Sequence, residues 1–103
     1  MLFETRGILM TSGVQASIQT GNISHADINS CLRKHFNNKG EECKDDNDLN
    51  AWSIKHKDGR VLSVFNNVGI DKIYIITDGL HLADDPVYGD EYPVTTILYA
   101  DEY

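Results

Sequence analysis

The polar side chains that come closest to an enzyme site lie in the middle of the chain: His35, Asp46, Asn50 and Arg60. A histidine can move protons near neutral pH, a carboxylate can act as a base, and an arginine can stabilise developing negative charge. If the helices of this region meet the strand that follows, the four groups could converge on one site. Each group also has a structural role open to it, in helix packing, capping, solvation or a cross-strand ion pair.

Two cysteines and two histidines of the same region could bind a metal, or a cysteine and a histidine could form a nucleophilic pair. Cys31 and His35 are one helical turn apart, and Cys43 and His56 would complete a zinc set. The spacing matches no compact zinc finger, and a cysteine–histidine pair would lack an orienting third group. We therefore interpret Cys31 as buried and His35 as partly buried on a helix, and we predict no catalytic residue, no metal and no cofactor.

Acidic residues of the C-terminal part give the chain its charge. Residues 1–60 hold eight Lys or Arg against eight Asp or Glu, whereas residues 61–103 hold Lys72 alone against eight acids, which accounts for the net charge of −7. Such a field repels phosphate backbones, so we expect no direct nucleic-acid binding and instead a basic partner protein. Aromatic rings among the acids could be buried at such an interface. The candidate interaction residues are Asp84, Asp85, Tyr88, Asp90, Glu91, Tyr92, Asp101 and Glu102.

The clearest helix must position the histidine. Ser24 followed three positions later by Asp27 is typical of a helix start, and the helix is predicted over residues 25–38, with Gly40 as the left-handed residue that ends it. Apolar side chains then recur at helical spacing, which predicts one buried stripe. The stripe consists of Ile28, Cys31, Leu32, His35 and Phe36.

Two shorter helices flank it. Ser12 is predicted to cap the first of them, because a hydroxyl at that position can accept from the following backbone N–H groups. Asp45 or Asp46 is predicted to cap the other, with Leu49 and Trp52 facing the core.

Strands provide the rest of the scaffold. Residues 60–66, 72–77 and 94–100 are rich in β-branched and aromatic side chains and predict an antiparallel meander with the middle segment central. Residues 2–10 predict a short N-terminal strand. The connection 79–93 is long for a hairpin, and its alternating acids and apolar residues predict that it packs on a surface. The fold class is therefore α+β, with two or three helices on one face of the sheet.

Length and composition favour one domain, residues 1–103. The chain has 103 residues and 41% hydrophobic residues, enough for one core but not for two. No apolar run reaches the roughly 20 residues that a membrane helix needs, and the first ten residues lack the pattern of a signal peptide. We therefore expect a cytoplasmic protein that makes no membrane contact, with both cysteines reduced.

The segments 59–65, 73–78 and 94–103 together resemble the small "plasmid-related" proteins of bacterial plasmids and other mobile elements. Members begin with a strand, a Thr-x-Gly turn and a short helix, as residues 11–13 do here, and end in a Thr-Thr-Ile-Leu strand followed by Glu-Tyr. His35, Asp46 and Asn50 also fall at similar positions. The family has no assigned activity, so the resemblance implies a plasmid, phage or integron-cassette setting. The insertion 79–93 and the two cysteines depart from the family's pattern.

Three functions follow from these residues. The leading one is a non-enzymatic accessory protein that binds a basic host protein through its acidic C-terminal surface. The alternatives are a small enzyme with a site around the four polar residues named first, and an acidic DNA mimic that blocks a host DNA-handling enzyme. We further predict a homodimer with the loop 79–93 at or near the interface, because an edge strand beside an apolar loop invites association.

Overall fold

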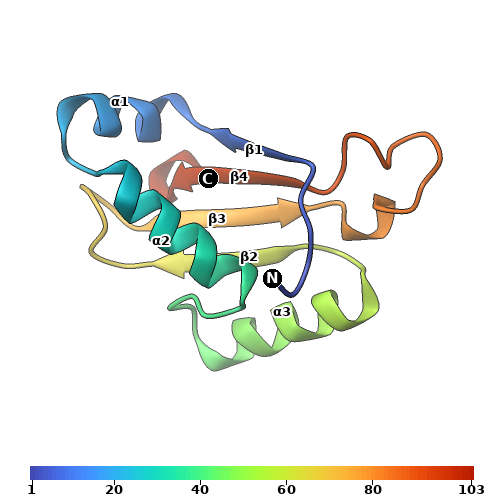
Figure 1. The fold of residues 1–103 in the computed structure, drawn as a ribbon. Coiled ribbons are helices and arrows are strands. Elements are labelled where there is room, and N and C mark those ends of the chain that lie inside the picture. Colours follow the sequence, from blue (N-terminus) through green and yellow to red (C-terminus); the bar gives the residue numbers. More distant parts are fainter.

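The computed structural model describes residues 1–103, and a four-stranded mixed sheet lies at their centre (Figure 1). The strands are β1 (Gly7–Met10), β2 (Val61–Phe65), β3 (Ile73–Asp78) and β4 (Val94–Tyr99). The helices are α1 (Ser12–Thr20), α2 (His25–Phe36) and α3 (Lys44–His56), and two 3₁₀ turns, Leu80–Leu82 and Ala100–Glu102, follow β3 and β4. None of the helices is long and apolar enough to cross a membrane.

The strand order β1-β4-β3-β2 contains the predicted meander. β3 pairs antiparallel with β2 on one side and with β4 on the other, so the middle segment is central, as expected. β1 adds to the free side of β4 and runs parallel to it, with Gly7 opposite Val94. The sheet is therefore mixed and is not a pure antiparallel meander.

The N-terminal strand is shorter than predicted, because the apolar residues before it pack elsewhere. The backbone N–H of Leu2 donates to the carbonyl oxygen of Phe36 at 2.8 Å. The Phe3 ring lies 5.3 Å, between centroids, from the rings of both His35 and Phe36. Residues 1–4 thus cross the helix-bearing side of the sheet, and only Gly7–Met10 enters the ladder (Figure 1).

One face of the sheet carries the core. Alternate residues of β2, β3 and β4 point to this face, and α1 and α2 cover it with their own buried side chains. The opposite face has no α-helix against it (Figure 1). The core consists of Val14, Ile23, Ile28, Cys31, Phe65, Ile73, Ile75, Ile97 and Tyr99.

The start of α2 is the predicted one. The backbone N–H of Asp27 donates to Ser24 Oγ at 3.0 Å, and the Ser24 N–H donates to Asp27 Oδ2 at 3.2 Å, which forms a capping box. The end of α2 differs from the prediction, because Asn38 rather than Gly40 takes the left-handed conformation, with φ 54°. Asparagine tolerates this conformation, and the side chain of Asn47 donates to the Asn38 carbonyl oxygen at 3.2 Å.

The caps of the other two helices were placed wrongly. α1 begins at Ser12 itself, so its cap is Thr11, whose hydroxyl accepts from the first turn at 3.5 Å. The cap of α3 lies two or three residues before the expected one: Cys43 occupies that position without a side-chain hydrogen bond, and Asp45 and Asp46 lie in the first turn. Their carboxylates there still oppose the positive end of the helix dipole.

α3 and the residues just before it lie along the outer edge of β2 and pair its backbone groups. The amide of Asn50 makes two hydrogen bonds with the Leu62 backbone, donating to its oxygen at 2.7 Å and accepting from its nitrogen at 3.0 Å. One residue pair further along the strand, the Glu41 N–H donates to the Val64 oxygen at 2.7 Å, and the Val64 N–H donates to Glu42 Oε1 at 3.2 Å. The edge groups of β2 are thus paired without a fifth strand.

This arrangement reverses the predicted orientation of α3. Leu49 and Trp52 were expected in the core, but 65% and 52% of their surfaces are exposed. The inward side of α3 is polar instead, because it meets backbone N–H and C=O groups that need partners, and Asn50 supplies them.

Candidate functional site

The connection between β3 and β4, residues 79–93, projects from one end of the sheet as a folded loop (Figure 1). A 3₁₀ turn at Leu80–Leu82 starts it. The backbone N–H of Gly89 donates to the Asp85 oxygen at 2.8 Å, and that of Tyr92 donates to the Tyr88 oxygen at 3.0 Å. The loop therefore has internal backbone structure and resembles a compact surface loop more than a hairpin turn.

One carboxylate of the loop makes hydrogen bonds within the loop. Asp85 Oδ1 accepts from the backbone N–H groups of Val87 at 2.7 Å and Tyr88 at 3.0 Å. These two hydrogen bonds stabilise the charged form and hold the pKa of Asp85 below its ordinary value. Asp85 is therefore a residue that shapes the loop.

The remaining side chains form the outer surface of the loop. Val87 is 73% exposed and Tyr88 49% exposed, and the Tyr88 ring packs edge-on against Tyr92 with 6.4 Å between centroids. The exposed acids beside this apolar tip are Asp84, Asp90 and Glu91. We call these five exposed residues, Val87 and Tyr88 with the three acids, the loop tip.

Asp101 and Glu102 do not belong to the same surface, contrary to what the sequence analysis assumed. They follow the last residue of β4, whereas the loop precedes its first residue, so the two acidic groups lie at opposite ends of the strand (Figure 1). The Glu102 carboxylate also makes hydrogen bonds within the protein. It accepts from the Thr11 hydroxyl at 2.6 Å and from the Tyr99 N–H at 2.9 Å, and these bonds lower its pKa.

Three of the four residues proposed for an enzyme site do meet. Asp46, Asn50 and Arg60 line a shallow groove of about 330 Å³ beside the exposed Leu49 and Trp52. The Asn50 amide is committed to the backbone of β2, so it has little capacity for a substrate.

His35 is not part of this groove. It is fully buried under α2, where Nδ1 lies 2.6 Å from Ser63 Oγ and Nε2 lies 2.8 Å from Thr77 Oγ1. Burial disfavours the charged ring and lowers the pKa of His35 to about 4. Arg60 lies on the opposite face, with its guanidinium carbon 5.7 Å from the centroid of the Tyr103 ring. The four residues therefore do not converge.

The hydrogen bonds beyond His35 fix which nitrogen carries its proton. Thr77 Oγ1 lies 2.8 Å from Thr95 Oγ1, Thr95 donates to Thr5 Oγ1 at 2.8 Å, and Thr5 donates to the carbonyl oxygen of Gly7 at 2.9 Å. A carbonyl oxygen can only accept, so each hydroxyl of the series must donate toward it. Thr77 then has to accept from His35, which makes Nε2–H the donor and Nδ1 the acceptor for Ser63. This neutral histidine links four segments of the chain, from β2 to the residues before β1.

The cysteines make no site with these residues. Both are free; Cys31 is buried, which raises the pKa of its thiol, and Cys43 is exposed. No group of three or more His, Cys, Asp or Glu side chains is placed to hold a metal ion.

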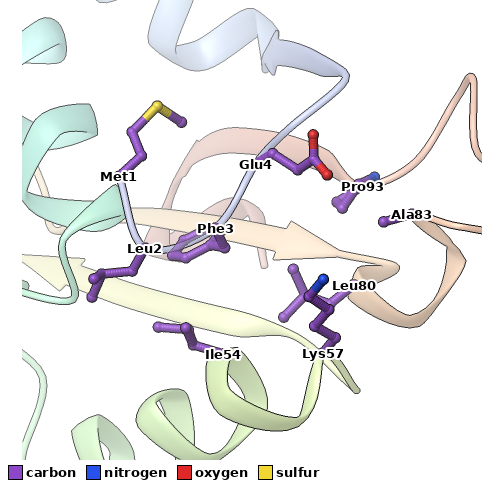
Figure 2. Close-up of a pocket in the computed structure, with 9 residues that line it drawn as sticks. All are labelled: Met1, Leu2, Phe3, Glu4, Ile54, Lys57, Leu80, Ala83 and Pro93. Atoms are coloured by element: carbon purple, nitrogen blue, oxygen red, sulfur yellow. The ribbon is translucent and has the colours of Figure 1, made fainter.

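A second hollow, which the sequence does not predict, lies on the helix-bearing side of the molecule. It has a volume of about 360 Å³ and lies between the N-terminal segment, the end of α3 and the base of the loop (Figure 2). Most of its lining is apolar. Lys57 is its one basic side chain, and Met1, which carries the chain's α-amino group, also lines it. The sequence offered little sign of this site, because its walls come from residues 1–4, from α3 and from the connection after β3, which only the fold brings together.

No family model, no curated protein and no solved structure matches the chain. The resemblance of its C-terminal segments to plasmid-related proteins therefore stays a prediction. Its function must be inferred from its own surfaces and contacts.

Proposed function

We propose that the protein is a non-enzymatic interaction module that binds a basic partner protein through the loop tip. The observation that carries this proposal is the exposure of Val87 and Tyr88 on a projecting loop with its own hydrogen bonds. Ordering such a loop before binding lowers the entropic cost of association. An exposed tyrosine beside an aliphatic side chain is the kind of anchor that interfaces use at their centre.

The charge of the tip favours a basic partner. Asp84, Asp90 and Glu91 are exposed, and neither ion pair of the chain involves them, since those pairs join Arg6 to Glu4 and Lys44 to Asp48. Free carboxylates around an apolar centre favour Lys or Arg groups on the partner and steer its approach. The binding should therefore weaken as ionic strength rises, because exposed charges are screened by salt.

Affinity capture from the native host, read by mass spectrometry at low and at raised salt, tests the proposal. The wild-type chain should retain one or more basic proteins that salt removes. A variant with Asp84→Asn, Asp90→Asn and Glu91→Gln should lose them, and so should the double variant Val87→Ser and Tyr88→Ser, whose charge is unchanged.

A matched control removes the same charge elsewhere. The variant Asp45→Asn, Asp46→Asn and Asp101→Asn has the same net charge as the loop variant, and its exposed positions lie on α3 and after β4. It should retain the partner. If the control and the loop variant lose the partner equally, net charge alone drives capture and the loop tip is not the binding surface.

The two alternative functions have less support. An enzyme site would need His35, which is fully buried and lies away from Arg60. A DNA mimic would need an array of carboxylates along one face, whereas the C-terminal acids are divided between the two ends of β4. A plasmid or another mobile element is proposed as the setting on the sequence resemblance alone, and the cytoplasm is proposed as the compartment on the sequence of the first ten residues and the lone pair of cysteines.

A further inference from the structure

The hollow at the base of the loop is independent of the loop tip and has the features of a small-molecule site. Its volume of about 360 Å³ lies at the lower end of the range for ligand pockets, roughly 300–1,000 Å³. Figure 2 shows the Phe3 ring on one side and the Leu80 and Lys57 side chains on the other. Two of the lining residues, Leu80 and Pro93, are buried, so packing inside the protein holds this part of the pocket wall in place. The residues that line it are Met1, Leu2, Phe3, Glu4, Ile54, Lys57, Leu80, Ala83 and Pro93.

The charges of this pocket are unequal. The Glu4 carboxylate is paired with the Arg6 guanidinium at 3.3 Å, outside the lining. The Lys57 ammonium has no acidic partner within 4 Å, since the second ion pair of the chain joins Lys44 to Asp48. An apolar pocket lined by the unpaired Lys57 ammonium is complementary to an apolar ligand that carries one negative charge.

The backbone at Lys57 fits a positioning role for its side chain. Lys57 ends α3 in the left-handed conformation, with φ 50°, where glycine is the usual residue. A lysine in this conformation costs conformational energy. The same turn has a glycine at its other left-handed position, Gly59 with φ 71°, but not at position 57. The left-handed residue of this turn thus carries a side chain into the pocket wall.

We infer that this pocket binds a small carboxylic acid, with the carboxylate on the Lys57 ammonium and a single ring or short aliphatic chain between Phe3 and Leu80. The inference does not depend on the proposed interaction with a basic protein, because no residue of the loop tip lines the pocket. The proposed ligand has an anionic head group, and the alternatives to be distinguished are ligands with a neutral or a cationic head group.

Three probes that differ only in the head group decide between them: octanoate, 1-octanol and octylamine. Titration calorimetry of the full chain should rank octanoate first and octylamine last. The histidine ring signals in NMR give a second readout, because Phe3 lines the pocket and also packs on His35 at 5.3 Å. Octanoate should shift the His35 signals and leave the Trp52 indole signal unchanged, since Trp52 does not line this pocket.

Two variants at one position test the role of the ammonium. Lys57→Met should weaken octanoate about tenfold, the scale of one lost charge-assisted hydrogen bond, and leave octanol unchanged. Lys57→Glu should invert the ranking and favour octylamine. Lys55→Met is the matched control, an exposed lysine on the same helix that does not line the pocket, and it should bind octanoate like the wild type. Ala83→Phe should fill the space and weaken all three probes.

Several results would overturn the inference. They are equal affinities for octanoate and octanol, a preference of the wild type for octylamine, an unchanged octanoate affinity in Lys57→Met, and no binding of any probe at millimolar concentration. Capture of a basic protein by the loop tip is measured with different variants, so either proposal can fail while the other holds.

Discussion

The hydroxyl of Thr11 donates to the carboxylate of Glu102 at 2.6 Å, although the two residues are 91 positions apart in the chain. The same carboxylate accepts from the Gly13 N–H at 3.3 Å, at the first turn of α1. Glu102 therefore holds Thr11, the cap of α1, and also accepts from one N–H of the helix's first turn. Two of the segments that enter the sequence resemblance, the Thr-x-Gly turn and the Glu-Tyr end, are in direct contact here.

We predict that Glu102→Gln destabilises the fold by about 1 kcal/mol, the usual net contribution of a hydrogen bond, because the neutral amide is a weaker acceptor than the carboxylate. The pKa of Glu102 is lowered in the folded state, so its contribution is present above the pKa of the unfolded chain and is lost as the pH falls through the folded value. Urea unfolding at pH 7 and at pH 3 measures this difference, which should be smaller in acid. Asp101→Asn, at the adjacent exposed acid, is the control and should unfold like the wild type.

Acid should destabilise the protein through His35 before most carboxylates titrate. The folded pKa of about 4 lies below the ordinary 6.5, so the unfolded state binds the proton more tightly and stability falls between about pH 6.5 and pH 4. A shift of this size corresponds to about 3 kcal/mol. In urea unfolding from pH 7 to pH 4, His35→Gln should lack this part of the pH dependence, and His25→Gln, at an exposed position, should keep it. An identical pH profile for His35→Gln and the wild type would contradict the buried neutral ring.

Truncation should destabilise the protein much more on the inward side of α3 than on its outward side. Asn50→Ala leaves an N–H and a C=O of Leu62 without partners and should cost about 1–3 kcal/mol. Trp52→Ala removes a half-exposed indole and should change the free energy of unfolding by about 0.5 kcal/mol or less. Chemical denaturation of both variants measures the comparison, and a larger loss for Trp52→Ala would mean that the indole is buried in solution.

The homodimer stays a prediction, and sedimentation tests it. The intact chain should sediment as a dimer, and a version with residues 80–91 replaced by an Asn-Gly turn should sediment as a monomer. The apolar contacts of Val87 and Tyr88, which are exposed in the single chain, supply the expected driving force. Two monomers, or two equally stable dimers, would show that this loop does not join the chains.

The sheet was predictable because its signals are local. β2, β3 and β4 occupy Val61–Phe65, Ile73–Asp78 and Val94–Tyr99, within one residue or so of the predicted segments, since continuous β-branched and aromatic runs have few other stable arrangements. The capping box at Ser24 was equally readable, because both of its partners lie within four positions.

What the sequence did not reveal depends on partners far away in the chain. Asn50 is an ordinary polar residue until α3 meets the edge of β2, so the apolar Leu49 and Trp52 were wrongly assigned to the inward side. His35 is buried without charge only because Ser63 and Thr77, from two strands, satisfy both ring nitrogens. Periodicity assumes that apolar side chains point inward, and it fails where a helix packs against unpaired backbone.

The two edges of the sheet have different capacities for growth. At β2, Asn50 and Glu42 already hold backbone groups that another strand would need. At β1, no strand lies alongside, Ile8 and Leu9 are exposed, and the Gln15 side chain reaches only the carbonyl of Met10. The sheet thus has one open edge. A strand from another chain can add at β1, but the β2 edge of the product offers no further site. Strand-by-strand pairing of identical chains would terminate at two copies and could not propagate into a fibre.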